Sequence, residues 1–135
     1  MEKKTAFKKA RGVSIMGDAE KSQKIAATAG FDWNDSAEII HKIIEEVDEC
    51  IDALQLPDNE NNITMELGDL LFSCINLARF LDIDPEHALN VSTTKFKKRM
   101  NAMQHLLNET NTSFSDIEPA EQEKLWSKVK ETEKA

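Results

Sequence analysis

The chain has 135 residues, of which 40% are hydrophobic, so it is long enough and apolar enough to bury a core. Its 25 Asp and Glu residues outnumber its 17 Lys and Arg residues, which gives a formal net charge of −8. This balance argues against general affinity for nucleic acids or membranes, and the lack of any signal-peptide or membrane-spanning pattern predicts a cytoplasmic protein.

The first 17 residues are rich in basic side chains, which predicts a loosely ordered basic arm carrying Lys3, Lys4, Lys8, Lys9 and Arg11. Residues 18–135 are expected to form one domain. Gly and Pro are scarce, and apolar residues recur at helical rather than alternating spacing, so the predicted fold class is all-α. A first helix is predicted over residues 18–29, ending at Gly30, because glycine readily adopts the left-handed conformation that terminates helices.

A second helix is predicted from Asp35, which can cap it, to Leu56, just before Pro57. Its apolar positions form one arc, made of Ile40, Ile43, Ile44, Val47, Cys50, Ile51 and Leu54. Along one edge of this arc lie Lys42, Glu46 and Glu49, whereas Glu45 and Asp48 point further outward. Because Glu46 and Glu49 are three residues apart, their carboxylates project from the same side of the helix.

A third helix is predicted over residues 63–81, with Asn62 as its cap. It is apolar on most sides, which is typical of a central, buried helix. One narrow polar stripe remains, made of Glu66, Asp69, Ser73 and Asn76, and Arg79 stands apart from it. The two cysteines, Cys50 and Cys74, lie among apolar residues without a Cys-x-x-Cys pair, so we expect buried, reduced thiols.

A fourth helix is predicted from Pro85 to Leu107, capped by Asp84, and a last short helix follows the loop 108–119. Basic and aromatic residues occur four apart on these helices, as Lys95 with Arg99 and Trp126 with Lys130. The short connections predict an antiparallel bundle of four to five helices.

If the second and third helices pack antiparallel, Glu46 and Glu49 face Glu66 and Asp69. Four neighbouring carboxylates resist simultaneous ionisation, so a divalent cation such as Mg²⁺ is expected between them. The alternative is that these acids are ordinary solvated charges, which is the better interpretation for Glu45 on spacing alone. A metal site with basic groups and an aromatic ring nearby would suit a nucleoside polyphosphate.

Five segments together resemble the MazG nucleoside triphosphate pyrophosphohydrolases over about residues 19–130. They are GFDW (30–33), KIIEEVDE (42–49), ELGDLLF (66–72), NLARFLDIDPEHAL (76–89) and KFKKR (95–99). The resemblance implies an all-α enzyme that depends on Mg²⁺, with Mn²⁺ as a substitute, and hydrolyses nucleoside triphosphates to the monophosphate and pyrophosphate. It also implies a homodimer or homotetramer and a role in clearing unwanted nucleotides.

The same resemblance implies a role for each matching residue. The metal ligands would be Glu46, Glu49, Glu66 and Asp69, with Glu45 supporting them or the attacking water. The phosphates would contact Lys42, Lys95 and Arg99, and the pair Trp126 and Lys130 would close over the nucleotide.

Three other functions are consistent with the sequence. One is a narrower relative, such as a dCTP, dUTP or phosphoribosyl-ATP pyrophosphohydrolase. Another is a helical module that binds nucleotides without catalysis, and the last is a structural bundle. A substrate panel separates the first from the resembling family. Saturable nucleotide binding without a Mg²⁺-dependent product would indicate the second, and thermal stability that Mg²⁺ does not change would indicate the third.

Overall fold

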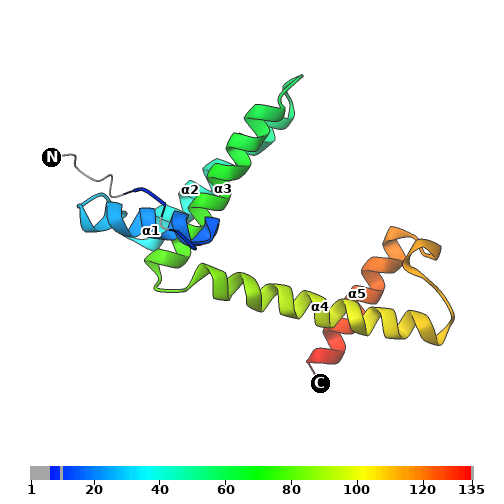
Figure 1. Cartoon of the computed structure of the whole chain (residues 1–135). Coiled ribbons are helices and arrows are strands. Elements are labelled where there is room, and N and C mark those ends of the chain that lie inside the picture. The colour runs from blue at the N-terminus through cyan, green and yellow to red at the C-terminus, as the bar shows by residue number, and fades with distance from the viewer. Residues whose placement is uncertain (1–6, 10, 135) are drawn as a thin grey trace. The chain divides into compact units, whose positions relative to one another are not determined.

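The computed structural model describes residues 7–9 and 11–134, and these residues form helices and no strand, which confirms the all-α class. The elements are α1 (Ile15–Thr28), α2 (Ser36–Leu54), α3 (Glu60–Phe80), α4 (Pro85–Glu109), a short 3₁₀ helix (Phe114–Asp116) and α5 (Pro119–Glu133) (Figure 1). Of the predicted basic arm, Lys3 and Lys4 lie outside the described residues. No described helix combines the length and apolar character needed to cross a membrane.

Local hydrogen bonds explain where the helices begin. Asp35 caps α2 as predicted, since its Oδ1 accepts a hydrogen bond of 3.0 Å from the backbone N–H of Glu38. The prediction for the first helix started too late, because Ser14 caps α1 by accepting a hydrogen bond of 2.9 Å from the backbone N–H of Gly17. Gly30, with φ of +99°, follows α1 as expected.

The third helix differs from the prediction at its start, and the fourth helix ends at Glu109 rather than at Leu107. α3 begins at Glu60 rather than at Ile63, so Asn62 lies within the helix instead of capping it. The side chain of Asn59 instead bonds the carbonyl of Ala53 and ties the loop to the end of α2. Asp84 accepts a hydrogen bond of 3.0 Å from the N–H of Glu86, as expected at the start of α4.

The chain divides into two compact units, one ending at Ala88 and the other beginning at Leu89. In the first unit α2 and α3 lie side by side as an antiparallel hairpin, and α1 packs on α3 (Figure 1). Its buried residues are Gln23, Ile39, Glu46, Ala53, Ser73 and Pro85. Three of these six are polar, so the first unit buries functional groups together with its apolar residues.

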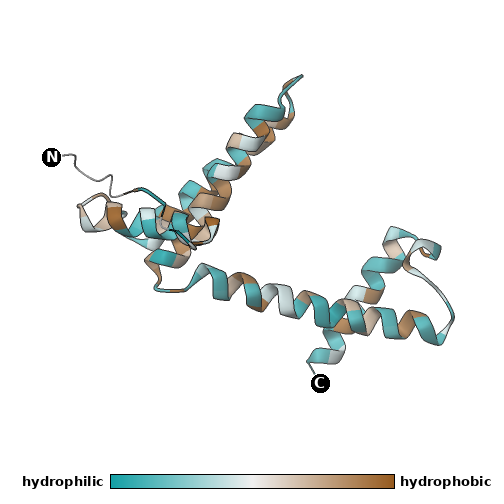
Figure 2. Cartoon of the chain, viewed as in Figure 1, coloured by the Kyte–Doolittle hydropathy of each residue, from teal (hydrophilic) through white to brown (hydrophobic). Residues whose placement is uncertain are grey.

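The predicted burial of the third helix is wrong in the single chain. Apolar residues line much of α2 and α3 (Figure 2), yet Leu67 is 49% and Leu71 58% exposed. On α2, Ile44 is 53% exposed. Cys74 is also exposed and Cys50 half-buried, and both are free thiols, so the expectation of two buried cysteines is wrong. The physical reason is that α1 and α2 cover only part of the surface of α3.

The second unit contains the rest of α4, the 3₁₀ helix and α5. Its buried apolar side chains are Met103 and Leu107 from α4 and Val129 from α5. The rings of Phe96 and Trp126 lie 6.0 Å apart, centroid to centroid, and join the two helices. This contact places Trp126 against α4, close to Arg99.

Candidate functional site

Three of the predicted metal ligands come together in the α2–α3 hairpin. Glu46 from α2 and Glu66 and Asp69 from α3 each offer one carboxylate oxygen, and these oxygens lie within 4.8 Å of one another. Glu46 is buried, Glu66 is half-buried and Asp69 is exposed. A spacing of three residues places Glu66 and Asp69 on the same side of α3. This side faces Glu46 of α2.

Each negative carboxylate of the cluster makes it less favourable for its neighbours to ionise. Burial raises the pKa of Glu66, and the negative charges of Glu49, Asp69 and Glu46 raise it further, while Lys42 opposes the rise. Glu49 itself is exposed and lies outside the group of three converging oxygens. The donor set therefore fits a hard divalent cation, which takes carboxylate oxygens and offsets their repulsion.

Lys42 connects the cluster to its surroundings. Its Nζ lies 3.0 Å from Oε1 of Glu46 and 3.8 Å from Oε2 of Glu45. The hydrogen bond to Glu46 is the main cause of the raised pKa of Lys42, and the charges of Glu45 and Asp69 add to it. The side chain of Glu45 is 69% exposed and contacts Lys42, so the structure places Glu45 beside the cluster rather than in it.

A cavity of about 570 Å³ adjoins the cluster at Lys42. It is lined by α1, the loop after α1, α2 and α3, including Ser73 and Asn76 from the predicted polar stripe. The structure therefore divides this stripe into two parts. Glu66 and Asp69 enter the carboxylate cluster, whereas Ser73 and Asn76 line the cavity.

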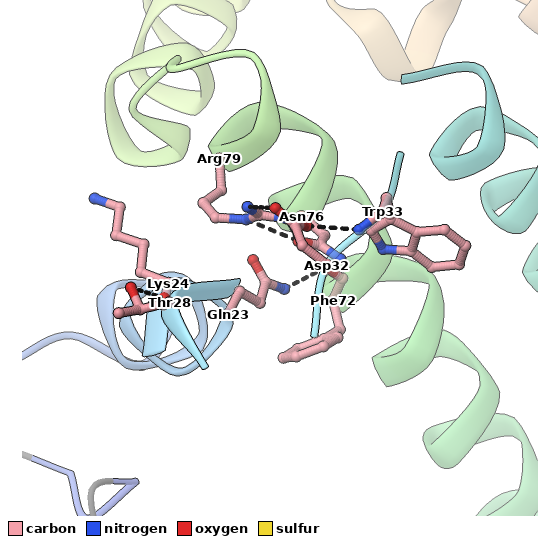
Figure 3. A network of polar contacts seen from close by, with 8 residues as sticks. All are labelled: Gln23, Lys24, Thr28, Asp32, Trp33, Phe72, Asn76 and Arg79. Atoms are coloured by element: carbon pink, nitrogen blue, oxygen red, sulfur yellow. Dashed lines mark hydrogen bonds and ion pairs between the residues drawn. The ribbon is translucent and has the colours of Figure 1, made fainter. Parts of the chain in front are cut away.

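Arg79 organises one wall of this cavity (Figure 3). Its Nη2 lies 2.7 Å from Oδ1 of Asp32, and its Nη1 donates to Oδ2 at 3.1 Å. The Arg79 hydrogen bonds are the main reason that the pKa of Asp32 is lowered. Oδ1 of Asn76 also accepts from Nε of Arg79 at 3.0 Å and from Nη2 at 2.6 Å. Arg79 thereby fixes the loop after α1 against α3.

The remaining predicted residues lie in the second unit. Arg99 is paired with Glu133, with Nε 3.1 Å from both carboxylate oxygens and Nη2 3.0 Å from Oε2. The guanidinium of Arg99 also lies 5.3 Å from the ring centroid of Trp126. Lys95 and Lys130 are exposed. The structure thus brings Arg99 and Trp126 together within the second unit.

Sequence reasoning did not identify Gln23 or Asp32, and it left Arg79 without a role. Gln23 is only 6% exposed, and its Nε2 donates to the carbonyl of Phe72 at 2.9 Å, across 49 residues of sequence. The one local signal for this network was the spacing of Asn76 and Arg79, three apart on a helix. The contacts to Gln23 and Asp32 depend on how α1 packs, which no local pattern encodes.

Comparison with known proteins gives concordant matches. Residues 34–118 match the MazG nucleotide pyrophosphohydrolase domain. The chain is 35% identical over 118 residues to the nucleoside triphosphate pyrophosphohydrolase/pyrophosphatase MazG of Thermotoga maritima, which covers 87% of this chain and 45% of that protein. It is 32% identical over 124 residues to the nucleoside triphosphate pyrophosphohydrolase of Escherichia coli K12, which covers 91% of this chain and 47% of that protein. The chain therefore spans about half the length of these relatives.

Proposed function

This chain belongs to the MazG nucleotide pyrophosphohydrolase domain family, and we propose that it hydrolyses nucleoside triphosphates to the monophosphate and pyrophosphate. The observation that carries the proposal is the convergence of Glu46, Glu66 and Asp69, whose oxygens lie within 4.8 Å of one another. A cluster of this kind has no evident structural purpose in a small helical hairpin, because its like charges oppose folding. It suits a protein that works on the phosphates of a nucleotide.

In the proposed reaction Glu46, Glu66 and Asp69 would hold Mg²⁺, or Mn²⁺ in its place, with Glu49 as a further ligand. When bound, the cation lowers the pKa of a water molecule and offsets the charge of the phosphates. Glu49 accepts the proton of the water that attacks the α-phosphorus. The bond from this phosphorus to the bridging oxygen breaks, and pyrophosphate leaves.

Basic residues would contact the charged product. Lys42 lies beside the carboxylates, and Lys95 and Arg99 would bind the leaving phosphates. Trp126 and Lys130 would close over the nucleotide. The support for these roles is the resemblance of the sequence to the family, the position of Lys42, Lys95 and Arg99 within the matched residues 34–118, and the contact of Arg99 with Trp126.

We also propose that the chain works as a homodimer or homotetramer. The support is that α2 and α3 carry large apolar side chains that the rest of the chain leaves exposed, among them Ile44, Leu67 and Leu71. An exposed apolar face of this kind marks an interaction site. A second copy of the same face would bury these side chains and enclose the hairpin that carries the carboxylates.

The test is product analysis with purified protein and each nucleoside triphosphate, with and without Mg²⁺. We expect Mg²⁺-dependent release of pyrophosphate. Release of orthophosphate would contradict the proposed cleavage. A dCTP, dUTP or phosphoribosyl-ATP enzyme would act on its one substrate, and a binding module would give no product.

Glu66→Gln is the informative variant, because it removes one charge from the cluster while preserving its volume. We expect it to abolish turnover and the rise in melting temperature that Mg²⁺ gives the wild type, with helical circular dichroism unchanged. Glu60→Gln is the matched control, since Glu60 is an exposed residue in the first turn of the same helix. Full activity of Glu66→Gln would remove Glu66 from the proposed ligands.

A further inference from the structure

Lys42 supplies positive charge to the carboxylate cluster. Its Nζ lies 3.0 Å from Oε1 of Glu46, whose side chain is only 7% exposed. Among the described residues, no other Lys, Arg or His forms an ion pair with Glu46, Glu66 or Asp69. Burial and the neighbouring carboxylates raise the pKa of Glu66, and the charge of Lys42 opposes that rise. Lys42 is therefore the counter-ion that this part of the chain itself provides.

The stability of α2 does not explain the pair of Lys42 and Glu46. Ion pairs four residues apart stabilise a helix best when the acid comes first, and here the lysine comes first. The side chain of Lys42 is 42% exposed, and fixing a long exposed side chain in one geometry costs conformational entropy. The contact is therefore held by the charge of the cluster, and a change in that charge can break it.

A divalent cation would compete with Lys42 for Glu46. The ammonium pairs with one carboxylate of the cluster, whereas a cation held by Glu46, Glu66 and Asp69 would use one oxygen from each, since these oxygens converge within 4.8 Å. Its double charge would also repel the ammonium. Both effects weaken the hold of Glu46 on Lys42, which also lines the neighbouring cavity.

We propose that the divalent cation and Lys42 compete for Glu46, so that binding of the cation releases the Lys42 ammonium to the phosphates of the nucleotide. Lys42 then acts as a positioning residue that makes the metal prepare the phosphate site before the nucleotide binds. Glu45 offers the released ammonium only a weak alternative, because its Oε2 lies 3.8 Å from Nζ and its side chain is 69% exposed. This inference rests on the proposed function.

The first test measures Mn²⁺ binding to the full chain without nucleotide, from the signal of free Mn²⁺ in electron paramagnetic resonance. Lys42→Met removes the competing charge and keeps a flexible side chain. Lys24→Met is the matched control, since Lys24 pairs with Glu20 four residues away in α1 and its loss changes the net charge equally. We expect Lys42→Met to bind Mn²⁺ about fivefold more tightly than Lys24→Met does. Lys42→Arg keeps the charge and should bind Mn²⁺ as wild type does.

The second test follows the released ammonium. The probe is inorganic tripolyphosphate, titrated by calorimetry into protein in saturating Mg²⁺. Lys42→Met should bind it about tenfold more weakly than Lys24→Met does, because a charged donor to phosphate is lost. Metal binding and phosphate binding thus change in opposite directions in one variant. A lysine that only held the cluster together would weaken both when removed, and a lysine that only contacted phosphate would leave Mn²⁺ binding unchanged.

Three results would overturn the competition. They are a Mn²⁺ affinity of Lys42→Met that equals or falls below that of Lys24→Met, tighter Mn²⁺ binding by Lys42→Arg as well, and tripolyphosphate binding that Lys42→Met leaves unchanged. Each of these results is compatible with Mg²⁺-dependent release of pyrophosphate by the wild type. A wild type that bound no Mn²⁺ would instead count against the proposed function itself.

Discussion

The ion pair between Asp32 and Arg79 gives a quantitative prediction for stability. The side chain of Arg79 is 8% exposed and that of Asp32 is 30% exposed, and two hydrogen bonds join them. Asp32→Asn keeps the shape but leaves a buried guanidinium without its carboxylate. Breaking a fully buried pair costs about 3–5 kcal/mol, and the partial exposure of Asp32 reduces this cost. We therefore expect Asp32→Asn to lower the free energy of unfolding by about 2 kcal/mol at neutral pH.

Urea unfolding followed by tryptophan fluorescence measures this loss, because Trp33 is adjacent to Asp32 and in the same unit. Asp48→Asn is the matched control, since Asp48 is an exposed residue of α2 and surface substitutions usually change stability by less than about 0.5 kcal/mol. If Asp32→Asn were no more destabilising than Asp48→Asn, the pair would contribute nothing, and the argument that Arg79 fixes the loop after α1 would be wrong.

The difference in stability between wild type and Asp32→Asn depends on pH, because the pKa of Asp32 is lowered in the folded chain. Near and below the ordinary carboxyl pKa, the unfolded chain binds a proton at Asp32 more readily than the folded chain does. The stability supplied by the pair is therefore complete above about pH 5, and falls as the pH drops below about 4 towards the folded pKa. The difference between wild type and Asp32→Asn should shrink over this acidic range. A difference that stayed constant there would refute the role of the charge.

Two further predictions concern other parts of the chain. Glu133→Gln should release Arg99 for phosphates and lower the KM for nucleoside triphosphates about threefold. Glu131→Gln, which changes a neighbouring exposed residue, should leave KM unchanged, and equal KM values for both variants would show that Glu133 does not compete. Leu71→Lys should lower the mass measured by sedimentation, because Leu71 is 58% exposed on the proposed self-association face. An unchanged mass would place the interface elsewhere.

Local patterns predicted those parts of the site that depend on one helix or one hairpin. The three-residue spacing of Glu66 and Asp69 and the short α2–α3 connection were enough to bring them to Glu46. The capping preference of Asp35 likewise decided where α2 begins. By contrast, Gln23 contacts the carbonyl of Phe72, a contact set by the way α1 packs. Sequence patterns do not specify that packing.

The exposure of α3 was missed for a different reason. A helix that is apolar on most sides has the same pattern whether its own chain or a second chain covers it. The pattern predicted that Leu71 needs a partner, but it did not predict which chain supplies one. The exposed apolar residues of α2 and α3 are therefore the ones that the proposed second copy would cover.

The polar stripe of α3 connects the carboxylate cluster to the cavity. Asp69 belongs to the cluster and Asn76 to the cavity, and the two residues are seven apart, which is about 10 Å along a helix. A single straight helix can therefore set the separation between the cluster and the cavity, because both side chains project from one rigid axis.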